Sequence, residues 1–139
     1  MALRVGVIGL GDVSMIHLHA IKLSEKAELV SVCDIDETKS NLIENVNFYT
    51  DYIEMIKKEN LDCVHICLPH YLHYPVTKEV ANLGVNVLLE KPLCLDTEEA
   101  EKFKELSDSI DTNICICLQN RYNNTVEKLR EIINSNVYG

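Results

Sequence analysis

A short glycine-containing segment near the start of the chain is the most specific sign of chemistry. It follows the apolar run 5–8 and places Gly9, Gly11 and Ser14 in the pattern Gly-x-Gly-x-x-Ser. Gly9 permits a turn that a Cβ would strain, Gly11 lets a pyrophosphate approach the main chain, and a following helix supplies free N–H groups and partial positive charge. Ser14 stands where glycine or alanine is usual, yet it is small enough for close packing of helix against strand. The pattern predicts a dinucleotide site, with a plain glycine turn as the alternative.

An acidic residue lies where such a unit places the carboxylate that binds the adenine ribose. Asp34 ends the apolar segment 28–33, roughly 20 residues after the glycines. Its negative charge would repel the 2′-phosphate of NADP, and no arginine follows to bind one, so NAD is favoured. Lys39 is near enough in the sequence to leave NADP as the weaker alternative.

Further polar residues follow the later apolar segments of the chain. They are Pro69 to His73, Glu90-Lys91-Pro92 and Gln119 to Tyr122. Because the carboxyl ends of parallel strands meet at one edge of a sheet, these segments should surround the same ligand as the glycine turn.

Lys91 is the residue that we expect to transfer a proton. Oxidation of an alcohol carbon needs a group that takes the hydroxyl proton, and a lysine suits this role when burial and nearby positive charge favour its neutral form. Glu90 would oppose this if its carboxylate faced the ammonium, and a surface Glu–Lys pair is the alternative. His70 and His73 could contact a substrate, or His73 could lie in the first turn of a helix. No third ligand accompanies these two histidines, so no metal site is predicted.

Apolar segments alternate with segments of helical periodicity along the whole chain. The expected strands span 5–8, 28–33, 46–49, 61–68, 85–89 and 113–118. Ile16, Ala20 and Leu23 fit one face of the first helix, a short helical segment reaches about residue 44, and the last helix is expected to place Val126, Leu129, Ile132 and Ile133 inward. This alternation predicts an α/β fold, a doubly wound parallel sheet (Rossmann fold) with helices on both faces.

Length and charge limit the possible classes of protein. The chain has 139 residues, enough for one domain, and its net charge of −9 argues against nucleic-acid or anionic-membrane partners. No apolar run approaches the roughly 20 residues that span a bilayer, and Met1 leads directly into the first strand without a signal peptide. The six cysteines (33, 63, 67, 94, 115 and 117) lie mostly in apolar segments without a CxxC pair. We therefore expect reduced core cysteines in a cytoplasmic protein.

These motifs together resemble the Gfo/Idh/MocA oxidoreductases, which include glucose–fructose oxidoreductase and inositol dehydrogenase. The likeness rests on residues 9–14 with His17, on Asp34, on Leu68-Pro69 with His73, on Glu90-Lys91-Pro92 and on the segment from Gln119 to Tyr122. The resemblance implies an NAD- or NADP-dependent dehydrogenase of sugars, polyols or related cyclic alcohols. It also implies that Lys91 lies beside nicotinamide and substrate and that the Lys91–Pro92 bond is cis. His70 departs from the asparagine that is often found in its loop.

On these grounds Lys91 and His73 are predicted to be catalytic. The predicted cofactor-binding residues are Gly9, Gly11, Asp12, Val13, Ser14, Asp34, Leu68, Pro69, His73, Glu90, Lys91, Gln119 and Arg121. For Arg121, binding of an anionic group and simple exposure at the end of a strand remain equally open.

The resemblance also bears on domain organisation. Residues 1–120 are expected to form the dinucleotide-binding domain and residues 121–139 a helix leading to a second domain, which in family members supplies further catalytic residues and usually the dimer interface. The chain should then bind NAD but turn over little substrate alone, and form homo-oligomers only through that domain. Two alternatives remain. One is a non-catalytic NAD-sensing module, which would not need Lys91, and the other is an S-adenosylmethionine-dependent methyltransferase, which would usually carry an acid just before the glycines.

Overall fold

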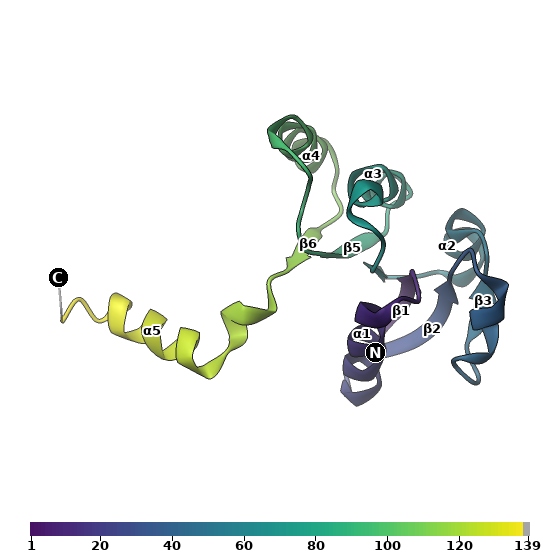
Figure 1. Ribbon diagram of the computed structural model, residues 1–139, viewed down its shortest axis with the longest axis horizontal. Coiled ribbons are helices and arrows are strands. Elements are labelled where there is room, and N and C mark those ends of the chain that lie inside the picture. Colours follow the sequence, from purple (N-terminus) through teal and green to yellow (C-terminus); the bar gives the residue numbers. More distant parts are fainter. Residues whose placement is uncertain (138–139) are drawn as a thin grey trace.

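The chain folds around a parallel sheet whose strands lie in the order β3-β2-β1-β4-β5-β6 (Figure 1). In the computed structural model, which describes residues 1–137, the strands are β1 (Leu3–Ile8), β2 (Ala27–Cys33), β3 (Asn47–Tyr49), β4 (Cys63–Ile66), β5 (Asn86–Glu90) and β6 (Ile114–Cys117). The helices are α1 (Asp12–Leu23), α2 (Tyr52–Glu59), α3 (His73–Asn82), α4 (Thr97–Ser109) and α5 (Asn124–Asn134), and the short 3₁₀ segments are η1 (Glu37–Asn41), η2 (His70–Leu72) and η3 (Gln119–Tyr122). The predicted doubly wound α/β fold is confirmed, although the segment that reaches residue 44 is only a 3₁₀ turn.

The strand order reverses in the middle of the sheet. The chain runs outward from β1 through β2 to β3, then returns to place β4 on the other side of β1 before continuing to β5 and β6. Successive connections therefore leave the carboxyl ends of β1 and β4 in opposite directions, which opens a crevice there for a ligand.

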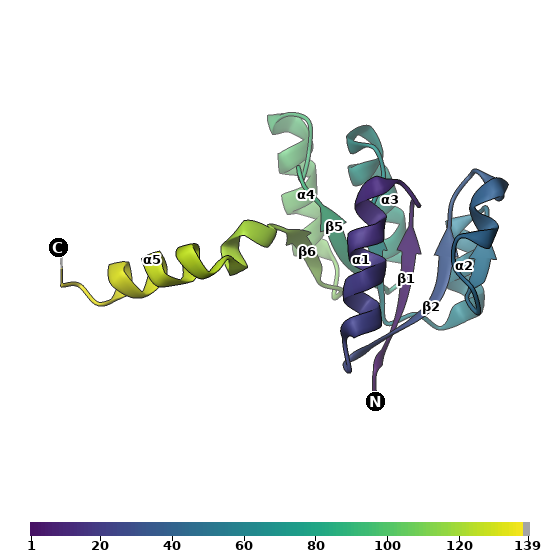
Figure 2. The same cartoon turned by 60° about the horizontal axis from the view of Figure 1, so that its bottom comes forward.

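Helices α2, α3 and α4 cover one face of the sheet (Figures 1 and 2). Met55 of α2, Val76 and Val80 of α3 and Phe103 of α4 pack with sheet residues such as Ile66 into one buried apolar cluster. Burial of such side chains is worth roughly 1.5–3 kcal/mol each. This face therefore holds most of the buried apolar side chains.

Helix α1 lies on the opposite face, and it buries a different stripe from the apolar one seen in the sequence. Ile16 and Leu23 are each 70% exposed, whereas Ser14 and His17 are among the residues that α1 turns toward the sheet. Ile16, Ala20 and Leu23, interpreted from the sequence as one apolar face, therefore lie on the solvent side of the helix. Leu18 and Ile21 fill the inner side in the second half of α1, while the small Ser14 and the hydrogen-bonded His17 occupy it nearer the N-terminus.

Helix α5 extends away from the sheet instead of packing on it, as both views show (Figures 1 and 2). Leu129 and Ile133 are 54% and 63% exposed, and Ile132 is also exposed. The expectation that Leu129, Ile132 and Ile133 point inward is therefore wrong, while Val126, the first of the four, is half-buried. The helical period was sound, but η3 turns the chain outward, and a period does not say which surface covers the apolar stripe.

Within residues 1–137, the α1 side of β4, β5 and β6 is covered only in part, where His17 of α1 contacts His65 and Glu90, and by no further helix. His65 and Leu88 are half-buried on this side, Cys117 is half-buried, and Cys115 is exposed. All six cysteines are free thiols, and of these Cys33 and Cys67 are buried. The expectation of core positions holds for Cys33 and Cys67 and fails for Cys115. Among residues 1–137, no helix is long and apolar enough to cross a lipid bilayer.

Candidate dinucleotide-binding site

A cavity of about 560 Å³ opens at the carboxyl ends of β1, β2 and β4. Of the residues predicted from the sequence, it is lined by Gly9, Gly11, Asp34, Leu68 and Pro69. Tyr71 and Leu72, from the predicted segment 69–73, also line it, whereas sequence reasoning missed Ile35, Pro75 and Val76. The position of Ile35 directly after Asp34 was a usable signal, because Asp34 was already predicted to lie at the ligand.

The two glycines of the turn serve different purposes. Gly9 has φ +90°, and a Cβ on it would lie 2.5 Å from the carbonyl oxygen of Cys67. It is therefore required by the backbone and by the close approach of the next strand. A Cβ on Gly11 would meet nothing within 4 Å, and φ there is an ordinary −83°. The bare main chain at Gly11 thus faces open space, as a ligand that approaches the backbone requires.

Helix α1 begins at this open space without a side-chain cap. Asp51 caps α2 by accepting from two backbone N–H groups, and Asp96 caps α4, but Gly11 leaves the first N–H groups of α1 without such a partner. Those N–H groups and the helix dipole form a site for an anion. Asp12 and Val13 are exposed in this first turn, so the backbone N–H groups are what they offer an anionic ligand.

Ser14 has a structural place in the turn. It is fully buried, and its hydroxyl donates to the carbonyl oxygen of Gly11 at 2.6 Å. The small side chain allows α1 to lie close to β1, as predicted for the third position of the motif. Its predicted role in cofactor binding stays a prediction, and the burial of its hydroxyl argues against a direct contact with a ligand.

Asp34 is bound to the glycine turn itself. Its Oδ2 accepts from the backbone N–H of Leu10 at 2.7 Å and from Lys39 Nζ at 2.8 Å, and its Oδ1 accepts from the N–H of Asp36 at 3.0 Å. Burial alone would raise the pKa of Asp34, but the hydrogen bonds from Lys39, Asp36 and Leu10 and the Lys39 charge together lower it. The carboxylate is therefore ionised and held rigidly at the cavity, with about four lone-pair sites of which three are used.

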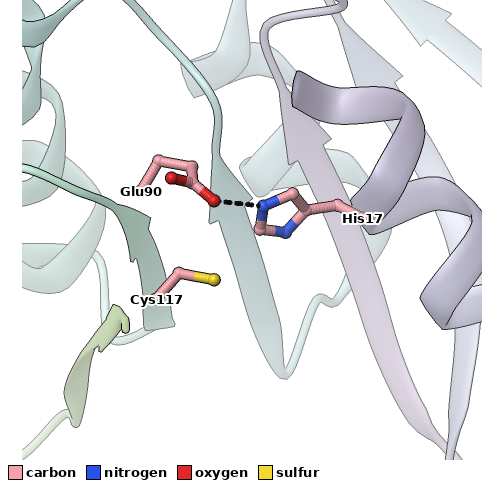
Figure 3. Close-up of side chains that lie close together, drawn as sticks. All are labelled: His17, Glu90 and Cys117. Atoms are coloured by element: carbon pink, nitrogen blue, oxygen red, sulfur yellow. Dashed lines mark hydrogen bonds and ion pairs between the residues drawn. The ribbon is translucent and has the colours of Figure 1, made fainter. Parts of the chain in front are cut away.

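Glu90 lies at the end of β5 with its carboxylate turned inward, toward α1 (Figure 3). His17 Nε2 lies 2.9 Å from Glu90 Oε1, and the backbone N–H of Lys91 donates to Oε2 at 3.1 Å. Burial alone would raise the pKa of Glu90, but hydrogen bonds from His17, the Cys117 thiol and the Lys91 N–H lower it. His17 and Cys117 were not among the predicted site residues, and only the fold brings them to Glu90.

Lys91 is exposed, and its neighbour does not neutralise it. The Glu90 carboxylate is engaged by His17 and by the Lys91 backbone, so the surface Glu–Lys pair considered for the sequence does not form. The Lys91–Pro92 bond is cis, as the family resemblance implied. The ammonium is thus free to meet a ligand at the sheet edge.

His73 does not have the exposed surface that contact with a substrate needs. It is fully buried at the start of α3, with Nδ1 2.7 Å from the carbonyl oxygen of Pro92 and Nε2 3.0 Å from that of Leu68. Each ring nitrogen faces a carbonyl oxygen, which can only accept a hydrogen bond. The side chain joins the segments after β4 and β5, which is a positioning task.

Gln119 and Arg121 are the predicted residues that the structure leaves apart. Both lie exposed in η3, where the chain leaves the sheet toward α5, and neither lines the cavity at β1, β2 and β4. Their contact with a cofactor stays a prediction.

The arrangement suits an extended ligand with an anionic centre. An apolar cavity with one fixed carboxylate fits a nucleoside, free N–H groups at α1 fit a pyrophosphate, and an exposed lysine lies beyond them at the end of β5. A dinucleotide has these parts in this order.

Comparison with known proteins gives the same assignment. Residues 3–115 match the GFO_IDH_MocA family model, described as "Oxidoreductase family, NAD-binding Rossmann fold". Myo-inositol 2-dehydrogenase of Thermotoga maritima is 26% identical over 141 residues, which cover 99% of this chain and 42% of that protein. D-glucoside 3-dehydrogenase of Escherichia coli is also 26% identical, over 99% of this chain and 40% of that protein.

A solved structure shares the fold along the whole chain. The WlbA dehydrogenase from Bordetella pertussis, crystallised in complex with NADH and UDP-GlcNAcA, aligns with a TM-score of 0.91 and 26% identity. The alignment covers 100% of this chain and 44% of that one. The present chain thus spans about two-fifths of the length of the relatives that it matches.

Proposed function

The chain belongs to the Gfo/Idh/MocA family of oxidoreductases with an NAD-binding Rossmann fold, and we propose that it is the cofactor-binding part of a dehydrogenase of sugars or polyols. Inositol and glucoside dehydrogenases among its relatives support this substrate class. Residues 1–120 form the dinucleotide-binding domain in this proposal, and residues 121–139 lead out of it. The family match leaves no place for the methyltransferase alternative.

The residues of the site accommodate NAD in one direction along the sheet edge. Asp34 would bind the adenine ribose, and Ile35 and Leu72 belong to the apolar cavity wall that would receive the adenine. Gly11 and the N-terminus of α1 would hold the pyrophosphate. When bound, NAD supplies the hydride acceptor of the reaction.

Lys91 is the residue that we assign to proton transfer. Its ammonium is exposed at the sheet edge, and the inward turn of Glu90 keeps a carboxylate away from it. A lysine near an oxidised nicotinamide ring is favoured in its neutral form by the positive charge of that ring, and it can then accept the proton of a substrate hydroxyl. His73 positions this segment through its contact with Pro92.

The observation that carries the proposal is the rigid attachment of Asp34 to the glycine turn at a cavity of nucleoside size. Calorimetric titration of the chain with NAD and NADP, beside the Asp34→Ala variant, tests it. We expect NAD to bind more tightly than NADP and Asp34→Ala to lose roughly tenfold or more, because a hydrogen bond to a charged group is worth about 1.5–3 kcal/mol.

Asp111→Ala is the matched control, since Asp111 is an exposed acid at the opposite end of the sheet, just before β6. It should bind NAD as the parent does. Absence of binding by both cofactors to the parent chain, with retained folding, would overturn the proposal for this chain.

A further inference from the structure

Three side chains that can bind a metal ion converge beside the end of β5 (Figure 3). They come from three separate elements, His17 from α1, Glu90 from β5 and Cys117 from β6, and their ligand atoms all lie within 4.8 Å of one another. We propose that His17 Nε2, a Glu90 carboxylate oxygen and the Cys117 thiolate form a site for a divalent transition-metal ion of the Zn²⁺ type. This inference does not depend on the proposed cofactor or substrate.

The separations are close to those that tetrahedral coordination needs. Zinc binds nitrogen and oxygen ligands at about 2.0–2.2 Å and sulfur at about 2.3 Å, which places tetrahedral ligand atoms roughly 3.3–3.7 Å apart. His17 Nε2 and Glu90 Oε1 are already 2.9 Å apart. Glu90 and Cys117 are also register partners on adjacent parallel strands, so the sheet holds the thiol in place. The three ligand atoms, all within 4.8 Å of one another, therefore lie close to tetrahedral spacing.

Charge balance favours a cation at this position. Glu90 and His17 are almost completely buried, and Cys117 is half-buried. A divalent ion with one carboxylate, one thiolate and one neutral imidazole is neutral overall, which avoids leaving a net charge in the interior. Binding breaks the S–H bond of Cys117 and forms a metal–sulfur bond, with the thiol proton leaving to solvent, while the His17 proton moves from Nε2, which donates to Glu90 in the free site, to Nδ1.

His65 supplies the outer partner that a metal-bound histidine needs. Its Nδ1 lies 3.1 Å from His17 Nδ1, so it can accept the N–H of that nitrogen while His17 Nε2 turns its lone pair to the metal. Such outer partners fix the tautomer and orientation of the ligand.

The part of the α1 side of β4–β6 that no helix covers gives an ion access to the site. Cys115, two residues before Cys117 on the same strand and the same face, is exposed. Three protein ligands leave the fourth tetrahedral position for a water molecule, as in sites that exchange ligands.

Cobalt(II) titration of the reduced full chain tests the proposal, because thiolate ligation gives a sulfur-to-cobalt charge-transfer band in the near ultraviolet. We expect this band in the parent chain, its loss on addition of Zn²⁺, and its absence in Cys117→Ser. Cys115→Ser is the matched control and should keep the band. A missing band in the parent, or a band that persists in Cys117→Ser, would overturn the site.

Two further variants keep the test decisive should Cys117→Ser fold poorly by circular dichroism. His65→Gln retains all three ligands, so it should keep the band while binding cobalt about 10–100-fold more weakly. Glu90→Gln should lose affinity with the sulfur band diminished only through lower occupancy. Unchanged affinity in both variants would refute the assigned ligand set.

Discussion

Alanine substitution of three glycines separates the backbone needs of the fold from those of the ligand. Gly84 has φ +83°, and a Cβ there would meet nothing within 4 Å, so Gly84→Ala bears only the left-handed strain of about 1–2 kcal/mol. Gly9→Ala bears the same strain and also drives a methyl group to 2.5 Å from the Cys67 carbonyl oxygen. Overpacking of this kind adds roughly 1–3 kcal/mol, so we expect a total of about 2–5 kcal/mol.

Gly11→Ala should leave stability nearly unchanged. Its φ of −83° suits alanine, and no atom lies within 4 Å of the new Cβ. The roughly 0.5–1 kcal/mol lost on replacing glycine by alanine at a helix N-cap is offset by about 0.4–1 kcal/mol from the reduced entropy of the unfolded chain. Urea unfolding should therefore rank the free energies of unfolding as Gly9→Ala lowest, then Gly84→Ala, with Gly11→Ala close to the parent.

NAD binding should follow the opposite order among the two variants that fold well. The methyl group of Gly11→Ala points into the space where a pyrophosphate would approach the α1 N-terminus, so we expect roughly a tenfold or greater loss of NAD affinity by calorimetry. Gly84→Ala lies after α3, away from the cavity, and should keep the parent affinity. The reasoning is refuted if Gly11→Ala unfolds as easily as Gly9→Ala, or if it binds NAD like the parent.

The remaining predictions concern charge, pH and the buried histidine. Lys39→Met removes one of the three hydrogen bonds that Asp34 accepts, so calorimetry should show equal or tighter NAD binding and weaker NADP binding. The control Lys22→Met, on α1, should change neither affinity. Stability should fall by roughly 2 kcal/mol from pH 7.5 to pH 4.5 through His65, because its folded pKa of about 4 lies below the unfolded 6.5 and the unfolded chain therefore binds more protons in this window. Urea unfolding of His65→Gln should show a flatter dependence, and an equal slope would contradict the assignment. His73→Phe removes the ring donor that faces the carbonyl oxygens of Pro92 and Leu68 and should lower the free energy of unfolding by about 1–3 kcal/mol, and an unchanged urea midpoint would exclude its positioning role.

Much of the fold follows from local sequence pattern. The alternation of apolar strands with helical periods predicts the parallel sheet, and Gly9, Gly11 and Asp34 mark one ligand edge because parallel strands end together. These inferences succeed because turn chemistry and strand composition depend on near neighbours in the chain. The cavity confirms that Leu68 and Pro69 belong to the same edge.

Contacts between distant segments are what the sequence leaves open. His17 meets Glu90 across 73 positions of the chain, and that pairing decides that Glu90 turns away from the Lys91 ammonium. His73 is buried between two carbonyl oxygens that come from different loops, so its burial has no local signature. Each of these outcomes depends on how the sheet brings strand ends together.

The sequence by itself determined the α/β class, the glycine turn, the acid at the end of β2 and the lysine after β5, because each depends on residues that are near neighbours in the chain. Only the tertiary structure decided which face of α1 is buried, that α5 stands apart from the sheet, and that His17, Glu90 and Cys117 converge. The physical reason is that amphipathic periodicity gives the direction of a face relative to its own helix, while packing against a partner surface decides what that face contacts.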